Sequence, residues 1–218
     1  MTNELITVAL PKGRMLEDSL RLFTVIGANG LENLRESRRL IWEDTTSGLR
    51  FLLLRGVDVP TYVEHGAADM GIAGKDVLIE QGKDVYEPLD LGFGFCRLVV
   101  AEPIELQGND DPRAWSYVRI ATKYPNITER HFSRKGIQVE VVKLYGSIEL
   151  APMAGLSERI VDLVSSGKTL AENGLVEVEE IMKATARLIV NRASLKTKYR
   201  RIKGLIDRLA EEVRALRS

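Results

Sequence analysis

Short apolar runs alternate with amphipathic segments along the first half of the chain. The run at residues 5–10 predicts a strand, and it stops at the Pro-Lys-Gly-Arg turn of 11–14. Apolar positions then recur at helical spacing over 15–26. Two further runs, at 40–42 and 49–54, are separated by a polar segment that contains a glycine, so they predict a β-hairpin.

The second half shows the same alternation and predicts a β-α-β unit within residues 117–144. A polar stretch with two prolines, 102–116, precedes this unit and indicates a surface connection. The segment 176–190 consists mostly of β-like runs. The remaining predicted elements are a strand at 96–101, helices at 60–66, 76–81 and 127–133, helices around 148–163, a loop at 165–168 with a short helix to 173, and one long helix over 193–216.

Strands that alternate with helices favour an α/β fold. Two such groups of elements suggest two lobes with a cleft between them. We expect lobe I to contain residues 1–93 and 178–218, and lobe II to contain residues 94–177. Ligands of open α/β sheets bind at the carboxyl ends of strands, so loops there are expected to carry the chemistry. The candidate loops are 11–14, 71–76 and 145–149.

The amino-acid composition argues against several classes of function. The chain of 218 residues has 31 Lys and Arg against 31 Asp and Glu, which argues against a protein that coats nucleic acid or an acidic membrane. Aromatic residues are 6% of the chain, too few for base-stacking platforms. The single cysteine, Cys96, excludes an intramolecular disulfide framework and a thiolate-rich zinc site, and two histidines are too few for a histidine-cluster metal site.

Targeting signals are not apparent in the sequence. The first four residues lack a basic region ahead of a short apolar run, so we do not expect a signal peptide. The longest apolar stretches, such as 51–54 and 98–101, are too short to span a bilayer. We therefore expect a cytoplasmic protein that does not bind membranes.

The segment Ser165-Ser166-Gly167-Lys168-Thr169 is the strongest candidate for chemistry. It is small, rich in hydroxyl groups and followed by helix-forming residues, so it can aim N–H and hydroxyl groups at a phosphate. Asp162 stands just before it and can accept hydrogen bonds from sugar hydroxyls, which suits a ribose 5-phosphate. A Walker loop is excluded because the position of its first glycine is occupied by Asp162. Taken alone, the five residues also fit an ordinary helix end and loop with a solvated Asp162.

A longer pattern decides between these interpretations. From Glu149 to Leu170 the chain reads Glu-x5-Gly-x-Ser-x2-Ile-x-Asp-Leu-x2-Ser-Gly-x-Thr-Leu, which resembles the signature of the ATP phosphoribosyltransferases. The resemblance continues in order over most of the chain, and its length is similar to that of the family's short form. The other similar segments are 9–14, 55–64, 71–76, 91–98, 121–126 and 144–147.

The resemblance implies a two-lobed fold of the type II periplasmic-binding-protein kind. It implies that N1 of the ATP adenine is joined to C1 of phosphoribosyl pyrophosphate, giving phosphoribosyl-ATP and pyrophosphate in the first step of histidine biosynthesis. Mg²⁺ would be carried on the substrates, with no metal ligands from protein side chains. A regulatory subunit related to histidyl-tRNA synthetase is the implied partner, and self-association is expected.

The resemblance also implies roles for individual residues. Asp162, Arg55 and Lys12 are the candidate catalytic residues. Asp162 and Glu149 suit the ribose hydroxyls. Phosphoribosyl pyrophosphate would be held by Glu149, Asp162, Ser165, Ser166, Gly167, Lys168 and Thr169, and the nucleotide or pyrophosphate by Lys12, Gly13, Arg14, Arg55 and Lys75.

Two other functions stay open at this point. One is a solute-binding or effector-sensing module of the same fold, since fold does not fix function. The other is a phosphoribosyltransferase that uses a different base. Arg38 and Arg39 fit either a solvated turn or a role across a dimer interface.

The predicted C-terminal helix carries an apolar stripe at alternating steps of four and three residues. Such a stripe either packs on the chain's own first lobe or partly contacts another subunit. A nucleic-acid role for its basic flanks is less favoured because acidic residues are interspersed. The stripe is formed by Leu195, Tyr199, Ile202, Ile206, Leu209, Val213 and Leu216.

Overall fold

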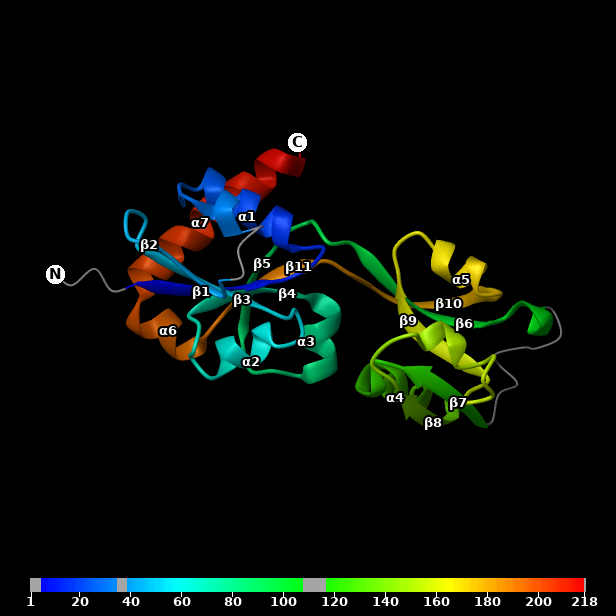
Figure 1. Ribbon diagram of the computed structural model, residues 1–218. Coiled ribbons are helices and arrows are strands. Elements are labelled where there is room, and N and C mark those ends of the chain that lie inside the picture. Colours follow the sequence, from blue (N-terminus) through cyan, green and yellow to red (C-terminus); the bar gives the residue numbers. More distant parts are fainter. Residues whose placement is uncertain (1–4, 35–38, 108–116, 218) are drawn as a thin grey trace. The chain divides into compact units, whose positions relative to one another are not determined.

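A computed structural model describes residues 5–34, 39–107 and 117–217, and the chain divides into two compact units (Figure 1). Unit 1 consists of residues Met1–Gly94 and Thr185–Ser218, and unit 2 of Phe95–Ala184. The second crossing between units lies later than the expected 177/178. The reason is that the strand Leu175–Ala184 pairs along its whole length with the strand Cys96–Pro103 of unit 2.

Unit 1 is built on a six-stranded mixed sheet in the order β2-β3-β1-β4-β11-β5. The central strands β3, β1 and β4 run parallel, and the predicted hairpin is present as the antiparallel pair β2–β3. The strands are β1 (Ile6–Pro11), β2 (Ile41–Asp44), β3 (Leu49–Leu54), β4 (Met70–Gly74), β5 (Tyr86–Asp90) and β11 (Ala186–Val190).

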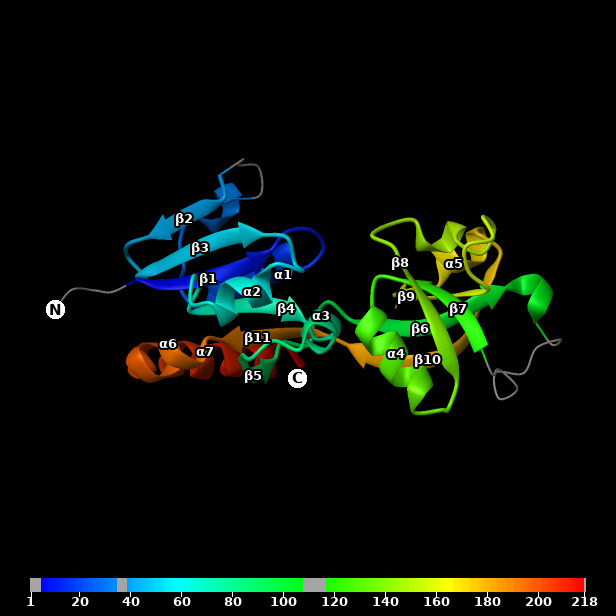
Figure 2. The ribbon, with the colours of Figure 1, turned by 90° about the horizontal axis from the view of Figure 1, so that it is seen from below.

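Helices cover both faces of this sheet: Figure 1 shows α1 and α7 on one side and α2 and α3 on the other, and Figure 2 shows the sheet from the side of α2. On one face, α1 and α7 bury apolar side chains such as Phe23 and Leu209 in the main core. On the other face, α2 and α3 contribute Val59, Val63 and Leu78 to a second apolar cluster. The helical elements of unit 1 are α1 (Leu16–Val25), η1 (Leu31–Leu34), α2 (Val59–Glu64), α3 (Lys75–Gln81), α6 (Arg192–Thr197) and α7 (Tyr199–Arg217).

The single long C-terminal helix that we expected is wrong, because the chain breaks between α6 and α7 at Lys198. Lys198 leaves the helical conformation, and its ammonium lies 3.1 Å from the buried carboxylate of Asp69. Asn191 fixes the start of α6: its Oδ1 accepts a hydrogen bond from the Ser194 N–H, and its Nδ2 donates to the Val63 carbonyl. Tertiary contacts thus set this break.

The apolar stripe of the C-terminal region packs against its own unit. Ile202, Leu209 and Val213 are buried in the unit 1 core, and Leu195 and Ile206 are partly buried against it. Only the two ends of the α7 part of the stripe, Tyr199 and Leu216, are exposed. The interpretation in which the stripe covers the chain's own first lobe is confirmed for these five residues.

Unit 2 is built on a five-stranded mixed sheet in the order β10-β6-β9-β7-β8. The strands β8, β7 and β9 run parallel to one another, while β6 runs antiparallel to both β9 and β10. The elements are β6 (Cys96–Pro103), η2 (Ile104–Leu106), β7 (Tyr117–Thr122), α4 (Pro125–Ser133), β8 (Gln138–Lys143), η4 (Ile148–Leu150), β9 (Arg159–Val164), α5 (Lys168–Glu172) and β10 (Leu175–Ala184).

The expectation of helices around 148–163 is wrong, and the error concerns the strand that carries Asp162. The structure has only the short η4 there, and residues 159–164 form β9 in the middle of the sheet. A central strand is apolar on both faces, so its sequence lacks the alternation that identifies a half-buried strand. Ile160, Val161 and Val164 are buried, and Asp162 is a polar residue within this apolar strand.

One face of the unit 2 sheet carries an apolar cluster beneath η4 and α5. Ile148 and Ala151 anchor η4 to it, and Leu170 anchors α5. Ala121 of β7 and Ile160 of β9 belong to the same cluster, so this face of the sheet lies beneath the predicted phosphate loop. Among the helices of the described ranges, none combines the length and hydropathy that a bilayer span requires.

Candidate functional site

The carboxyl ends of three parallel strands gather the predicted residues of unit 2 at one edge of its sheet. The strands β7, β8 and β9 end at Thr122, Lys143 and Val164. The chain leaves each strand there in a loop, and loops at this edge are where α/β sheets bind ligands. The segments 145–149 and 165–169 are both at this edge.

The predicted phosphate loop connects β9 to α5 and is open to solvent. Ser165, Ser166, Lys168 and Thr169 are exposed. Gly167 has φ +77°, a left-handed conformation that glycine adopts without strain, and it starts α5. A Cβ at this position would meet only Val164 Cγ1, at 3.9 Å, so the surface above the turn is open. The loop can therefore approach a phosphate with its backbone.

Asp162 lies on β9 three residues before the loop and is only 9% exposed. Its Oδ1 accepts a hydrogen bond of 2.8 Å from the Leu163 N–H. Burial raises the pKa of Asp162, the Lys123 ammonium opposes this rise, and the Glu149 carboxylate adds to it. Asp162 and Glu149 are thus at the same strand edge and interact electrostatically, and Lys123, which has no predicted role, interacts with Asp162 as well.

Glu149 is held at this edge by the short η4. Ile148, the residue before Glu149, is fully buried. Ser147, at the start of η4, has φ +48°, and among the described residues it is the non-glycine residue with a positive φ. Tyr145 in the same loop is 85% exposed, and the Lys143 ammonium lies 5.6 Å from its ring centre. The loop therefore presents an aromatic ring and a carboxylate at the edge that carries Asp162.

The basic residues predicted from sequence gather at the corresponding edge of unit 1. Strands β1 and β3 are parallel, with Pro11 paired to Leu54, so Lys12 and Arg55 follow side by side. The Lys12 N–H donates a 2.7 Å hydrogen bond to the Leu54 carbonyl, which fixes the start of the loop. Gly13 has φ +90°, and Lys12, Arg14 and Arg55 are exposed.

These cations differ in their availability. Within the described ranges, Lys12, Arg14 and Arg55 form no ion pair. Lys75 follows the parallel strand β4 at the same edge, but its ammonium lies 2.9 and 2.7 Å from the two carboxylate oxygens of Glu87. Lys75 is thus already occupied by a carboxylate. Of the basic pair after the first helix, Arg39 is exposed and Arg38 lies outside the described residues.

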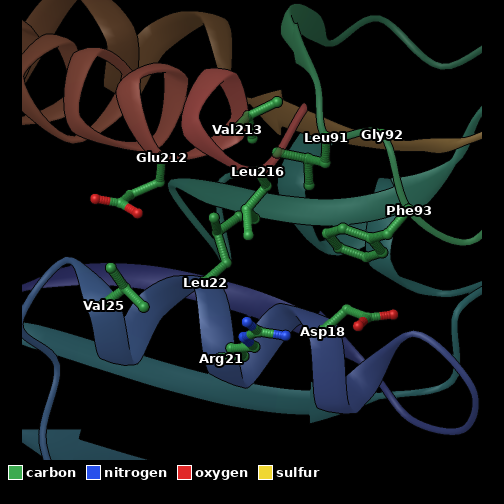
Figure 3. A pocket seen from close by; sticks show the side chains of 10 residues that line it. All are labelled: Asp18, Arg21, Leu22, Val25, Leu91, Gly92, Phe93, Glu212, Val213 and Leu216. Atoms are coloured by element: carbon green, nitrogen blue, oxygen red, sulfur yellow. The ribbon is translucent and has the colours of Figure 1, made fainter. Parts of the chain in front are cut away.

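A separate groove in unit 1 lies between α1 and the end of α7, with a volume of about 290 Å³. Figure 3 shows Leu22 and Val25 of α1 on one side and Leu216 of α7 on the other. Its lining combines apolar side chains with the charged Asp18, Arg21 and Glu212, and no predicted site residue lines it. Two carboxylates against one guanidinium do not suit a polyphosphate substrate, so the strand edge of each unit is a better candidate. Within the described ranges, no three His, Cys, Asp or Glu side chains are arranged to hold a metal ion.

The chain is similar to known proteins over most of its length. The family model described as HisG, ATP phosphoribosyltransferase, matches residues 55–211. An ATP phosphoribosyltransferase of Citrifermentans bemidjiense is 60% identical over 210 residues, which is 96% of this chain and 99% of the relative. ATP phosphoribosyltransferase 2 of Geobacter sulfurreducens is 62% identical over 208 residues, covering 95% and 98%.

The chain belongs to the ATP phosphoribosyltransferase family. Its activity is the transfer of the phosphoribosyl group from phosphoribosyl pyrophosphate to ATP, the first step of histidine biosynthesis. The solved ATP phosphoribosyl transferase (HisG:HisZ) complex from Thermotoga maritima contains a chain that is 34% identical to this ATP phosphoribosyltransferase. The TM-score is 0.82, and the match covers 97% of this chain and 100% of that one, which identifies the short form of the family.

More distant structures share only the fold of this ATP phosphoribosyltransferase. A substrate-binding protein of an amino-acid ABC transporter matches with a TM-score of 0.58 and 16% identity, covering 98% of this chain and 93% of that one. The aliphatic sulphonate binding protein SsuA of Escherichia coli matches with a TM-score of 0.60 and 12% identity, covering 98% and 75%. The expected likeness to periplasmic binding proteins is confirmed.

Proposed function

We propose a substrate-binding role for the strand edge of each unit. The edge of unit 2 takes the ribose 5-phosphate part of phosphoribosyl pyrophosphate: residues 165–169 hold the phosphate, and Asp162 with Glu149 accepts the ribose hydroxyls. The edge of unit 1 takes the pyrophosphate or the triphosphate with Lys12, Gly13, Arg14 and Arg55. The observation that carries this proposal is the position of Asp162, a buried carboxylate on the strand that leads directly into an exposed hydroxyl-rich loop.

In the reaction, N1 of adenine forms a bond to C1 of the ribose while the bond from C1 to the pyrophosphate oxygen breaks. The electron pair of that bond leaves with pyrophosphate, so positive charge develops on the ribose ring and negative charge on the leaving group. Asp162 and Glu149 orient the ring through its hydroxyls, and the basic side chains stabilise the leaving group. Catalysis of this kind consists mostly of positioning and charge stabilisation.

The four cations of unit 1 are not equivalent in this scheme. Arg55 and Arg14 offer the planar fork that matches phosphate oxygens, and Lys12 offers a compact charge. Lys75 contributes after its ion pair with Glu87 opens. We therefore place Arg55 and Lys12 with Asp162 as the catalytic residues, and Lys75 at the margin of the phosphate site.

Mg²⁺ enters this scheme as part of the substrates. It prefers oxygen ligands and commonly binds through substrate phosphates together with water. The pyrophosphate group supplies such oxygens. The protein's share is then to contact the magnesium–pyrophosphate unit with the basic residues of unit 1.

Membership of the family supports a proposal for the partner and the location of the chain. The related Thermotoga maritima protein was solved as a HisG:HisZ complex, and we propose a regulatory subunit of that kind, related to histidyl-tRNA synthetase, for this chain. Self-association and a cytoplasmic location belong to the same proposal, with no role in binding nucleic acid or membranes. Light scattering of the chain alone and with the regulatory subunit tests the assembly.

The decisive test of the site is pyrophosphate release by the complex. Release is expected to need both ATP and phosphoribosyl pyrophosphate, and to fall sharply in Asp162→Asn. GTP in place of ATP is the control for the identity of the base. A solute-binding module would bind a substrate in calorimetry without releasing pyrophosphate, and a folded Asp162→Asn variant with parental turnover would refute the assignment of this residue.

A further inference from the structure

Lys123 directly follows the strand β7, and Asp162 lies on the neighbouring parallel strand β9. The register of β7 and β9 pairs Ala121 with Ile160 and Thr122 with Val161, and the next residues along are Lys123 and Asp162. Side chains two residues apart on a strand share a face. Ala121 and Ile160 both lie in the apolar cluster beneath η4 and α5, so the same alternation, continued one residue past the end of β7, predicts that Lys123 is on the face where Asp162 lies.

The backbone around Lys123 is held firmly at the end of β7. The fully buried Thr122 accepts a 2.9 Å hydrogen bond from the Tyr124 N–H through its Oγ1. The Thr122 carbonyl accepts another, of 3.0 Å, from the Leu144 N–H. The helix α4 begins directly afterwards at Pro125. The backbone of Lys123 is therefore held in place at this strand edge, although its side chain is exposed.

The residues around Asp162 offer little other positive charge to offset its carboxylate. On the other side of β9, the residue of β6 in register with Asp162 is Val99, which is apolar. Glu149 of η4 is an anion and makes ionisation of Asp162 less favourable. Lys168 of α5 is directed to solvent, with its ammonium 3.8 Å from Glu172. Among the described residues, Lys123 is the cation that acts on Asp162, and it forms no ion pair of its own there.

We propose that Lys123 is a positioning residue of the transferase: its ammonium keeps the buried Asp162 carboxylate ionised, and thus able to accept the ribose hydroxyls beside Glu149. This inference rests on the role proposed for Asp162. Two carboxylates at one edge repel each other when both are charged, and a single lysine beside them offsets that repulsion without neutralising both.

The test is the pH dependence of kcat/KM for phosphoribosyl pyrophosphate, measured on the complex with its regulatory subunit from about pH 5 to about pH 9. In Lys123→Met the acid limb is expected to move to higher pH, so that the loss relative to the parent deepens as the pH falls. A move of one pH unit appears as about a tenfold loss below the limb. Lys123→Arg is expected to restore the parental limb.

A second readout does not depend on turnover. Carbon-13 NMR of labelled aspartate carboxyl groups, assigned with Asp162→Asn, follows the titration of Asp162 directly, and Lys123→Met should raise its pKa. The matched control is Lys143→Met. It removes the same charge at the end of β8, one strand further from Asp162 and on the opposite face, because Lys143 pairs with Thr122 rather than with Ala121.

The outcomes separate this inference from the proposed function. An unchanged acid limb and an unchanged titration in Lys123→Met overturn the inference, and so does a loss that is uniform across the pH range. An equal shift in Lys143→Met also overturns it, since the effect would then be general. The assignment of Asp162 fails only if Asp162→Asn itself keeps parental activity.

Discussion

The Arg159 guanidinium lies 3.1 Å from the Glu102 carboxylate, and both side chains are nearly inaccessible to solvent, with exposures of 6% and 5%. The two residues come from the adjacent strands β9 and β6. Removal of one partner leaves a buried charge without its counterion, which typically costs about 3–5 kcal/mol. The pair therefore holds the strand that carries Asp162 in register with its neighbour.

We accordingly expect Arg159→Met to lower the free energy of unfolding of unit 2 by about 3–5 kcal/mol in denaturant titrations. The control is Arg119→Met, which removes a guanidinium paired with Glu158 where both side chains are about 40% exposed. Exposed pairs contribute about 0–1 kcal/mol. Equal effects of the two variants would show that burial is not the cause. The double variant Glu102→Leu with Arg159→Met should recover most of the loss.

Asp162→Asn should reduce kcat/KM by about one to two orders of magnitude, because a charged hydrogen bond to a sugar hydroxyl is worth about 1.5–3 kcal/mol. Asn keeps the size of the side chain and one acceptor, so the fold should persist. Steady-state kinetics and circular dichroism measure the two effects. Glu149→Gln, at a half-buried position of η4, is the companion variant and should cause a smaller loss.

Asp162→Asn should raise the stability of the fold, although it lowers the activity. Burial raises the pKa of Asp162 above its ordinary value of 3.8, so the folded state holds a proton that the unfolded state has released between these two values. Stability from this group is therefore present at low pH and is lost as the pH rises through the raised pKa. Asp162→Asn should unfold at higher denaturant concentration than the parent at neutral pH, and this advantage should disappear near pH 3. A variant that is less stable at neutral pH would contradict the prediction.

Gly167→Ala should raise KM for phosphoribosyl pyrophosphate more than KM for ATP. A left-handed conformation costs a residue with a Cβ about 1–2 kcal/mol, and the added methyl group stands where the phosphate would approach the backbone. Gly174→Ala is a close control, since Gly174 has φ +66° and no atom within 4 Å of an added Cβ. Equal changes in both Michaelis constants, or the same change in the control, would count against the phosphate loop.

Leu209→Ala in α7 should lower the free energy of unfolding by about 2–5 kcal/mol, since Leu209 is fully buried in the core of unit 1. Leu216→Ala removes a leucine from the same stripe where it is 63% exposed, and should change stability by less than about 0.5 kcal/mol. Thermal unfolding compares the two. If Leu216→Ala alone changes the mass measured by light scattering, the exposed end of the stripe contacts another subunit.

Sequence patterns predicted the elements whose residues carry a local signal. The hairpin of β2 and β3 follows from two apolar runs and the turn between them, and α1 follows from apolar positions at helical spacing. The strand β9 was mistaken for helix because it is buried on both faces, which removes the alternation on which strand prediction depends. The break at Lys198 has no local signal, since it depends on a carboxylate more than a hundred residues away.

In the candidate site, too, some residues can be identified from local sequence and others only from the structure. The motif identified Asp162 and the loop 165–169, because these residues are contiguous or nearly so. Lys123 can be related to Asp162 only from the register of β7 and β9, which pairs residues about forty positions apart in the sequence. Lys75 shows the reverse: its place after a strand suggested a free cation, and the structure gives it Glu87, which lies on another strand.

The way in which the chain crosses between units has a consequence for synthesis on the ribosome. Unit 2 is one continuous stretch, so all its strands are available once residue 184 has emerged. Unit 1 lacks β11 until then, and β11 is the strand that joins β4 to β5. The nascent N-terminal segment therefore carries the open edge of β4 and an unpaired β5 throughout the synthesis of unit 2. Open strand edges are templates for pairing with other chains, so this interval is when the nascent protein most needs a chaperone.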